Sequence, residues 1–247
     1  MIHRYLLFLI FGLVLGGCAH KPYVITQYQP SFISIKDSIT KEEKVVEFLM
    51  PYKKSMDSVM DVVIGKSEVP LSKSQPESTM GNFAADAQLE AAKKLDNLVT
   101  ISVVNYGGLR IPFVPKGNIT KGKIYEIMPF DNMLTVIEIP GEVLRQFCNH
   151  MAAWKGWPVS GISYVIEDGK ATEIKIDGKP LKENQTYRLV TSDYIAHGGD
   201  DCDFLIRLKQ YPYSVFLRDA LIEKVKRDSK DGKGLHPQIE NRISYAK

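Results

Sequence analysis

The chain has 247 residues, of which 44% are hydrophobic and 25% are charged, and its formal net charge at pH 7 is +3. This composition is typical of a globular protein with enough apolar residues to bury a sizeable core. The length allows one domain of about 200 residues or two smaller ones. The sequence contains no run of five or more basic residues, so no electrostatic footprint favours a nucleic-acid partner.

The N-terminus has the pattern of an export signal. His3 and Arg4 precede an apolar run from Tyr5 to Leu15, which Gly16-Gly17-Cys18 follows. The run is too short to span a bilayer, which needs about 20 apolar residues. Its ending resembles a bacterial lipobox, which implies a signal peptide over 1–17, a lipid on Cys18 and an exported protein anchored to a bacterial membrane, in the periplasm or at the cell surface. A plain signal peptide and an uncleaved anchor are the alternatives.

The rest of the chain is expected to hold a spacer with a first strand over 18–38 and one domain over 39–247. Apolar residues at three- and four-residue spacing predict a helix over 41–60 and a clearer one from Ser78 or Thr79 to Leu95. Asp177-Gly178 is typical of a hairpin turn. Further helices are expected after Thr120 and over 142–153 and 215–226, and polar loops are expected over 71–77 and 227–234. Strands are expected over 28–35, 59–64, 98–104, 133–139, 162–167, 173–176, 187–191 and 239–245. Interspersed strands and helices predict an α+β fold, in which helices pack on a mixed β-sheet.

Two cysteines other than Cys18 are present, Cys148 and Cys202, which lie 54 residues apart. An exported location would permit a disulfide between them, and two separate thiols in or near the core are the alternative. No CxxC pair and no Cys/His spacing typical of zinc occurs.

Three loops combine glycine or proline with polar or aromatic residues. In the first, Asn105 to Arg110, the glycines let the backbone approach a ligand and Arg110 can pair with an anion. The second is Met128 to Asn132, whose Phe130 is by default a core residue. The third runs from Ser192 to Asp200 and carries Tyr194. The plainer interpretation of the first loop is a tight turn with a solvated arginine, and that of the third is a glycine turn with an acidic partner for a backbone N–H.

The order of these loops resembles a known family. Glu77 to Ala87, Asn105 to Arg110, Gly117 to Thr120 with Pro129 to Asn132, and Tyr194 to Asp200 are similar to successive signatures of the C-terminal domain of bacterial and animal 5′-nucleotidases. The resemblance runs from about Lys41 to Leu205. It implies the α+β fold of that domain and a pocket for a nucleotide or nucleoside.

The resemblance also implies roles for single residues. Phe130 and Tyr194 would sandwich the base, Asp200 would hold the ribose hydroxyls, and Arg110 would contact substrate near the phosphate. The implied substrate-binding residues are Asn105, Gly107, Gly108, Arg110, Phe130, Asn132, Tyr194, Gly198, Gly199 and Asp200.

One stretch departs from the family pattern. Many members carry an arginine shortly before the segment that matches Met80-Gly81-Asn82, whereas this chain has Lys73-Ser74-Gln75-Pro76 there. Lys73 would act as a point charge without the two-pronged geometry of arginine. Tyr194 replaces the more usual phenylalanine and should still stack on a base.

The metal-bearing half of such enzymes has no counterpart in the sequence. The five histidines, His3, His20, His150, His197 and His236, form no Asp-x-His, Gly-Asn-His-Asp/Glu or Gly-His-x-His segment, although a two-metal hydrolase needs clustered Asp, His and Asn ligands. We therefore expect no catalytic residue and no metal site in this chain, and two divalent metals in a separate metallophosphatase partner. The alternatives are a nucleotide- or nucleoside-binding lipoprotein without hydrolysis, and a decayed pocket, against which the retained aromatics and Asp200 weigh.

Overall fold

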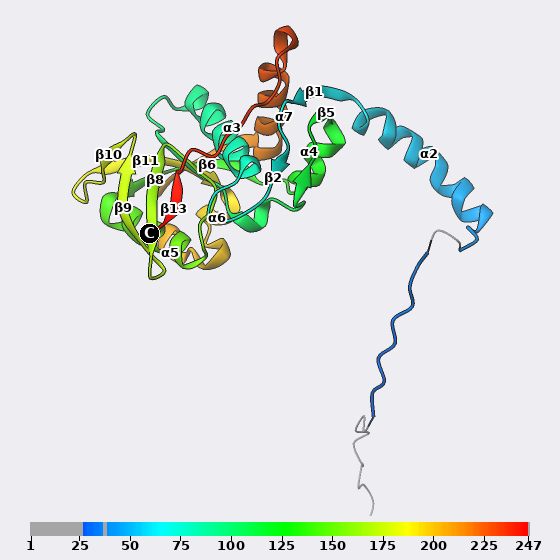
Figure 1. Ribbon diagram of the computed structural model, residues 1–247, viewed down its shortest axis with the longest axis horizontal. Helices are drawn as coiled ribbons and strands as arrows, with labels where there is room; N and C mark the ends of the chain where they lie inside the picture. The colour runs from blue at the N-terminus through cyan, green and yellow to red at the C-terminus, as the bar shows by residue number, and fades with distance from the viewer. Residues whose placement is uncertain (1–26, 37–38, 247) are drawn as a thin grey trace, which may run out of the picture. The chain divides into compact units, whose positions relative to one another are not determined.

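The structure is a computed structural model that describes residues 27–36 and 39–246 (Figure 1). The signal-like segment and Cys18 lie outside the described residues. The chain divides into two compact units between Phe48 and Leu49, a point inside the helix α2 (Glu43–Met60). No residue of α2 is buried. Within the described ranges, no helix combines the length and hydropathy needed to cross a bilayer.

The strand expected over 28–35 is wrong. Residues 27–36 have no strand assignment, and every one of their side chains is exposed. A strand needs a partner for its backbone N–H and C=O groups, and the described residues supply none here. Pro30 in addition has no N–H to donate.

A five-stranded mixed sheet organises the second unit. Its order is β12 (Lys209–Phe216), β6 (Met133–Pro140), β11 (Thr186–Ser192), β3 (Ile101–Val103) and β7 (Val159–Ser160). The neighbours β3 and β11 are parallel, whereas β6 is antiparallel to both β11 and β12, and β7 is antiparallel to β3.

Side chains alternate across this sheet, so each face has its own core. Leu134 and Val136 of β6 pack into one apolar cluster, and Ile137 and Ile139 of the same strand pack into the other. The first cluster includes residues of α3 (Thr79–Leu95), α4 (Lys121–Ile127) and α7 (Leu217–Asp228). The second includes residues of α5 (Gly141–Ala153) and of a four-stranded sheet. The order of this sheet is β10 (Lys179–Pro180), β9 (Lys170–Ile176), β8 (Ile162–Glu167) and β13 (Ile243–Tyr245).

Short elements complete the unit. Two two-stranded sheets pair β1 (Val63–Ser67) with β5 (Gly117–Thr120) and β2 (Leu71–Ser72) with β4 (Phe113–Val114). Single helical turns follow as α6 (Asp193–Ala196), η1 (Tyr106–Gly108), η2 (Gly199–Asp201), η3 (Asp203–Leu205) and η4 (Lys230–Gly232).

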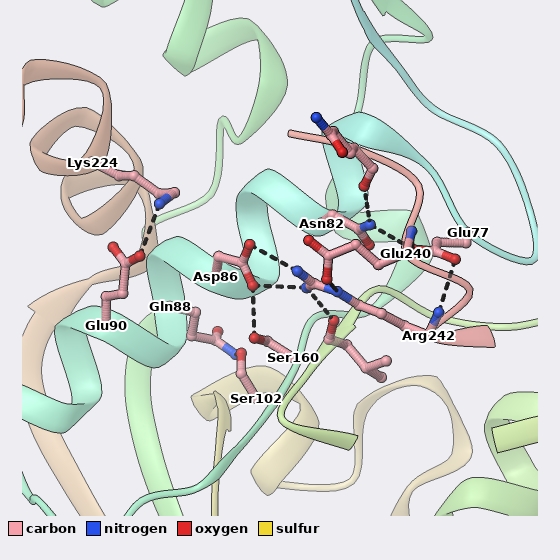
Figure 2. Close-up of polar contacts among 12 residues, drawn as sticks. Glu77, Asn82, Asp86, Gln88, Glu90, Ser102, Ser160, Lys224, Glu240 and Arg242 are labelled. Carbon is pink, nitrogen blue, oxygen red and sulfur yellow. Dashed lines mark hydrogen bonds and ion pairs between the residues drawn. The ribbon is translucent and has the colours of Figure 1, made fainter. Parts of the chain in front are cut away.

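The C-terminal segment is held against α3 by a polar network (Figure 2). Arg242 donates two hydrogen bonds to Asp86, at 2.7 and 3.0 Å. Glu77 accepts the backbone N–H groups of Glu240 and Arg242, and Asn82 donates to the Gln238 carbonyl at 2.7 Å. Residues from both ends of the domain are thereby joined.

The expected α+β fold with a mixed sheet is confirmed, and so are several local signals. Ser78 accepts the Gly81 N–H at 3.0 Å and caps α3, and Thr120 caps α4 in the same way. The strand expected over 162–167 is β8. Asp177-Gly178 forms the expected hairpin turn, because the residues that flank it pair with each other.

Other bounds were wrong. The strand expected over 59–64 is β1, which runs through Gly65 with a register irregularity, while residues 59 and 60 complete α2. Val215 and Phe216 end β12, which the sequence did not reveal, so α7 begins at Leu217 and takes residues 227 and 228 from the expected loop. The strands expected over 98–104 and 239–245 shrink to β3 and β13, and the loop expected over 71–77 contains β2.

Candidate functional site

The topology of the large sheet brings three loops to one edge. The loop Asn105–Arg110 follows β3, and Tyr194 and Asp200 follow β11. Because β3 and β11 are parallel neighbours, their carboxyl ends lie at the same edge. The strand β6 is antiparallel to β11, with Leu134 opposite Ser192, so the residues just before β6 arrive there as well. Phe130 and Asn132 are among those residues.

These loops surround a cavity of about 270 Å³. Eight of the ten residues expected to bind substrate line it: Asn105, Gly107, Gly108, Arg110, Phe130, Asn132, Tyr194 and Asp200. Gly198 and Gly199 are not among the lining residues and lie in the adjoining turn. A cavity of this size is slightly below the range of about 300–1,000 Å³ that is typical of small-molecule sites.

Asp200 is fixed by its neighbours. Its two carboxylate oxygens accept hydrogen bonds from the Tyr194 hydroxyl and from Asn105 Nδ2, each at 2.8 Å. His150 Nε2 lies 2.9 Å from its carbonyl oxygen. The backbone of Asp200 is left-handed, with φ 51° and ψ 44°, a region that aspartate tolerates better than most residues. Each carboxylate oxygen keeps capacity to accept a further hydrogen bond from a ligand.

Gly199 is required by the position of Tyr194. A Cβ on Gly199 would lie 2.5 Å from Tyr194 Cζ and 2.6 Å from Cε1, which is far inside van der Waals contact. The glycine therefore lets the tyrosine ring lie against the turn that carries Asp200. The hydrogen bond to the Asp200 carboxylate raises the pKa of the Tyr194 phenol, and partial burial adds to this effect.

Two aromatic rings on the cavity wall are open to solvent. Phe130 is 40% exposed and Tyr194 is 47% exposed. The Arg110 guanidinium carbon lies 5.6 Å from the centroid of the Phe130 ring, a cation–π distance. Large apolar side chains that remain exposed around a cavity indicate a binding surface rather than a core.

Arg110 and Lys73 place two positive charges near the cavity. Among the residues that the structure describes, the Arg110 side chain makes one hydrogen bond, a long one of 3.3 Å to the Gly107 carbonyl. Lys73 donates to the Leu109 carbonyl at 2.7 Å, and its Nζ lies 4.0 Å from the centroid of the Tyr106 ring. Neither cation has an ion-pair partner in the part of the chain that the structure describes. Partial burial lowers the pKa of the Lys73 ammonium, and the charge of Arg110 lowers it further.

Arg218, at the start of α7, holds the segment that carries Phe130. It donates to the carbonyls of Pro129 and Phe130, at 3.3 and 3.0 Å, and to Asp131 at 2.6 Å. Its guanidinium lies 4.2 Å from the centroid of Tyr125, and the residue is only 7% exposed. Sequence reasoning missed this arginine, because no motif marks it and 88 residues separate it from Phe130.

Comparison with known proteins agrees with this geometry. The sequence model described as "5′-nucleotidase, C-terminal domain" matches residues 63–206. The chain belongs to this family. The family segment contains all the residues that line the cavity, whereas Arg218 and the C-terminal residues up to Tyr245 lie beyond the match.

Relatives of known name are larger proteins. A 5′-nucleotidase of Vibrio parahaemolyticus serotype O3:K6 (strain RIMD 2210633) is 28% identical over 185 residues, 70% of this chain and 31% of that protein. Endonuclease YhcR of Bacillus subtilis (strain 168) is 31% identical over 157 residues, 60% of this chain and 12% of that protein. The crystal structure of a 5′-nucleotidase precursor from Thermus thermophilus superposes with a TM-score of 0.71 and 27% identity, over 82% of this chain and 43% of that chain. This chain spans less than a third of the length of the two curated relatives.

The described residues do not fit a metal centre of the kind that 5′-nucleotide hydrolysis would use. Within 27–36 and 39–246, no three His, Cys, Asp or Glu side chains come together as a metal site. His150 instead contacts the Asp200 carbonyl and packs edge-on against Trp157, with ring centroids 5.5 Å apart. No catalytic step can therefore be routed through a metal held by these residues.

Cys148 and Cys202 are both free and buried, so of the two alternatives left open by the sequence, the structure has separate thiols. Burial raises the pKa of each thiol to about 12. For Cys202, the nearby carboxylates of Asp200, Asp201 and Asp203 add to the effect. Neither thiol is suited to act as a nucleophile at neutral pH.

Proposed function

We propose that this chain binds a nucleotide or nucleoside in the 270 Å³ cavity and presents the phosphate ester to a separate metallophosphatase, which holds two divalent metals. The observation that carries the proposal is Arg110. Its guanidinium has no ion-pair partner among the described residues, and it stands at a cavity that also offers two exposed aromatic rings and one carboxylate. Only a ligand with matching chemistry uses all of these groups.

A nucleotide has that chemistry. Its base would stack on Phe130 and Tyr194, and such stacking contributes about 1–3 kcal/mol per base while tolerating different bases. Its ribose diol would donate to the Asp200 carboxylate, an ionised acceptor that makes strong hydrogen bonds. Its phosphate would pair with Arg110, with Lys73 as a second positive charge. Asn105 and Asn132 supply further polar contacts, and Gly107 and Gly108 give the ligand access to the backbone.

Hydrolysis would need more than these residues. The described part of the chain holds no metal cluster, and a two-metal site supplies both the nucleophile and the charge stabilisation for phosphate-ester cleavage. The name of the Vibrio relative, a 5′-nucleotidase more than three times as long as the matched segment, supports an association with a hydrolase. In this proposal the chain contributes substrate binding and the partner contributes the reaction.

The alternative is a nucleotide- or nucleoside-binding lipoprotein with no hydrolysis in its cycle. The lack of a metal cluster in the described residues is equally consistent with this alternative. The two functions differ in one respect, because only the first requires a metallophosphatase whose activity rises when this chain is present.

We also propose export and attachment to a bacterial membrane through a lipid on Cys18. The support is the lipobox-like ending Leu15-Gly16-Gly17-Cys18 after an apolar run. Acyl chains would hold the protein firmly, since each buried methylene contributes about 0.8 kcal/mol. In cells grown with labelled palmitate, the protein should carry label in the membrane fraction, and Cys18→Ser should abolish the label. Label retained by Cys18→Ser would contradict the attachment site.

Binding is tested by titrating AMP and adenosine into the protein in a calorimeter. Phe130→Ala and Tyr194→Ala should each weaken binding of both ligands by about tenfold or more, because each removes a stacking surface. Arg110→Ala should weaken AMP far more than adenosine, since only AMP has a phosphate. Undisturbed affinity in both aromatic variants would contradict the stacking role.

Catalytic partnership is tested by mixing. The protein is added to a metallophosphatase from the same organism that lacks a substrate-binding domain of its own, with Mn²⁺ present, and phosphate release from AMP is followed. We expect the rate to rise with added wild-type protein and not with Phe130→Ala. Nucleotide binding without any stimulation or co-purification would favour the binding lipoprotein over the split enzyme.

A further inference from the structure

A second cavity adjoins the first. It measures about 410 Å³, and Gly107 and Asp200 line both cavities. The other residues that line it are Gln75, Tyr106, Ala153, Trp154, Lys155 and Trp157. The two cavities therefore meet at Asp200, the residue whose carboxylate holds the ribose of the bound nucleotide in the proposed function.

Aromatic side chains dominate the second cavity. Trp154 is 51% exposed, an uncommon state for so large an apolar side chain. Trp157 is almost fully buried and packs edge-on against Phe147, with ring centroids 6.0 Å apart, so it forms a rigid part of the wall. Gln75 Nε2 donates to the carbonyls of Trp154 and Gly156, at 2.5 and 2.9 Å. The loop that presents Trp154 is thus fixed in place before any ligand arrives.

Lys155 adds a positive charge in a strained position. The Lys155 N–H donates to Ala152 and the Gly156 N–H donates to Met151, the two hydrogen bonds of a Schellman motif at the end of α5. Lys155 occupies the left-handed position of this motif with φ 65°, where glycine is strongly preferred. Within the described ranges, its ammonium has no ion-pair partner. The lysine is thus carried on the wall of the cavity at a backbone position that glycine would adopt more easily.

We propose that the second cavity binds a second nucleotide, joined through a 3′-phosphodiester to the nucleotide in the first cavity, so that the preferred ligand is a 5′-phosphorylated ribodinucleotide. This inference rests on the proposed function, because that function places the first ribose at Asp200. The second base stacks on Trp154 and Tyr106, and Lys155 balances the charge of the bridging phosphate. A mononucleotide leaves the second cavity empty.

The junction between the cavities allows such a link. A side chain on Gly107 would project into open space, since an added Cβ there meets nothing closer than Asn105 Nδ2 at 3.8 Å. The bare backbone leaves a passage for the phosphodiester. Asp200 keeps its role, because the free 2′-hydroxyl of the first ribose still donates to it. Hydrogen bonds from Asn105 and Tyr194 to both carboxylate oxygens reduce its repulsion of the phosphodiester.

The test is a calorimetric comparison of AMP with the 5′-phosphorylated dinucleotide pApA on the full chain. Wild-type protein should bind pApA at least about tenfold more tightly than AMP. Trp154→Ala and Lys155→Gly should each bring the affinity for pApA to within about threefold of that for AMP, and each should leave AMP binding unchanged within about twofold. Asp168→Gly is the matched control, because Asp168 also has a left-handed backbone, with φ 50°, and lies in the turn between β8 and β9.

Lys155→Gly also guards against a folding artefact. Glycine suits the left-handed position better than lysine, so the thermal unfolding midpoint of this variant should not fall. Equal affinity of the wild type for AMP and pApA would overturn the inference while leaving the proposed function intact. A gain for pApA that survives in both variants would overturn the assignment to this cavity. Absence of AMP binding by the wild type would instead contradict the proposed function itself.

Discussion

At the scale of single residues, the candidate site depends on groups that do not touch the cavity. Arg218 is buried and holds the carbonyls of Pro129 and Phe130. Gly199 makes room for the ring of Tyr194. Each therefore acts on one of the two aromatic side chains that are proposed to sandwich a base. The spacing and tilt of the rings therefore depend on residues outside the wall of the pocket, as expected for a site whose first contacts are held by a supporting layer.

Replacing Arg218 by alanine should weaken both folding and binding. The free energy of unfolding should fall by about 2–4 kcal/mol, because two backbone carbonyls lose their donor and a cavity is left. AMP affinity should fall as well, since the segment that carries Phe130 loses its anchor. Urea unfolding and calorimetry measure the two effects. Asp131→Ala is the control: it removes only the exposed partner of the ion pair, which is 75% exposed, and should cost less than about 1 kcal/mol. An Arg218→Ala protein with wild-type AMP affinity would contradict the positioning role.

The two buried thiols should not react with a thiol reagent in the folded protein at pH 8. Burial raises the pKa of Cys148 and of Cys202 to about 12, so in the folded protein each stays protonated until the pH approaches that value. The thiolate is the reactive form. In a Cys18→Ser protein at pH 8, a thiol-titrating reagent should therefore detect almost no thiol in the native state and two thiols in denaturant. Detection of no thiol in denaturant would indicate a disulfide, contrary to the structure.

At the scale of elements, the helix α3 joins segments that are distant in the sequence. Its Gln88 donates from the core to Ser102 and to the carbonyls of Val103 and Val190, at 2.9 to 3.2 Å. Its Asp86 meets Arg242 near the C-terminus (Figure 2). One helix thus connects the strands β3 and β11, which lead into the site, to the last strand of the fold.

The ion pair between Asp86 and Arg242 should contribute measurably to stability. The Arg242 side chain is 12% exposed and that of Asp86 is 27% exposed, so solvent screens the pair only in part. Arg242→Ala should lower the free energy of unfolding by about 2–3 kcal/mol, and a double-mutant cycle should give a coupling of about 1–3 kcal/mol. The matched control is the pair Lys226–Glu223, whose side chains are 50% and 65% exposed. Its coupling should stay below about 0.5 kcal/mol, and equal couplings for the two pairs would contradict the argument.

Elements with strong local signals were predictable from the sequence, and elements defined by tertiary pairing were not. The helix α3 has a serine cap and a continuous apolar face, and its expected range was correct. The strand β12 was missed because it is an edge strand of intermediate burial interrupted by Pro212. The three loops were recognisable from motifs, and the structure gathers eight of their residues at one cavity. The role of Arg218 was not predictable, because its contacts are to backbone carbonyls far away in the sequence.

At the scale of the whole molecule, the stability should reside in the second unit. Every residue of the two apolar clusters lies between Leu71 and Ile243. The described residues before Leu49 include no buried side chain. Apolar burial is the dominant favourable contribution to folding, so the first unit has little to contribute to the unfolding transition.

Deletion of residues 1–48 therefore provides a direct test of where the fold is encoded. The shortened protein should unfold in a single cooperative transition, with a midpoint within about 2 °C of the full chain, because a loss of about 1 kcal/mol would already shift the midpoint of a 150–250-residue domain by about 2–4 °C. It should also bind AMP as the full chain does, since all cavity-lining residues are retained. Differential scanning calorimetry measures the midpoint, and calorimetric titration measures AMP binding. The positive control for core damage is Leu71→Ala in the full chain. Leu71 is fully buried, so its truncation should lower the free energy of unfolding by about 2–5 kcal/mol. A midpoint lowered as far by the deletion as by Leu71→Ala would mean that the N-terminal residues belong to the folding unit after all.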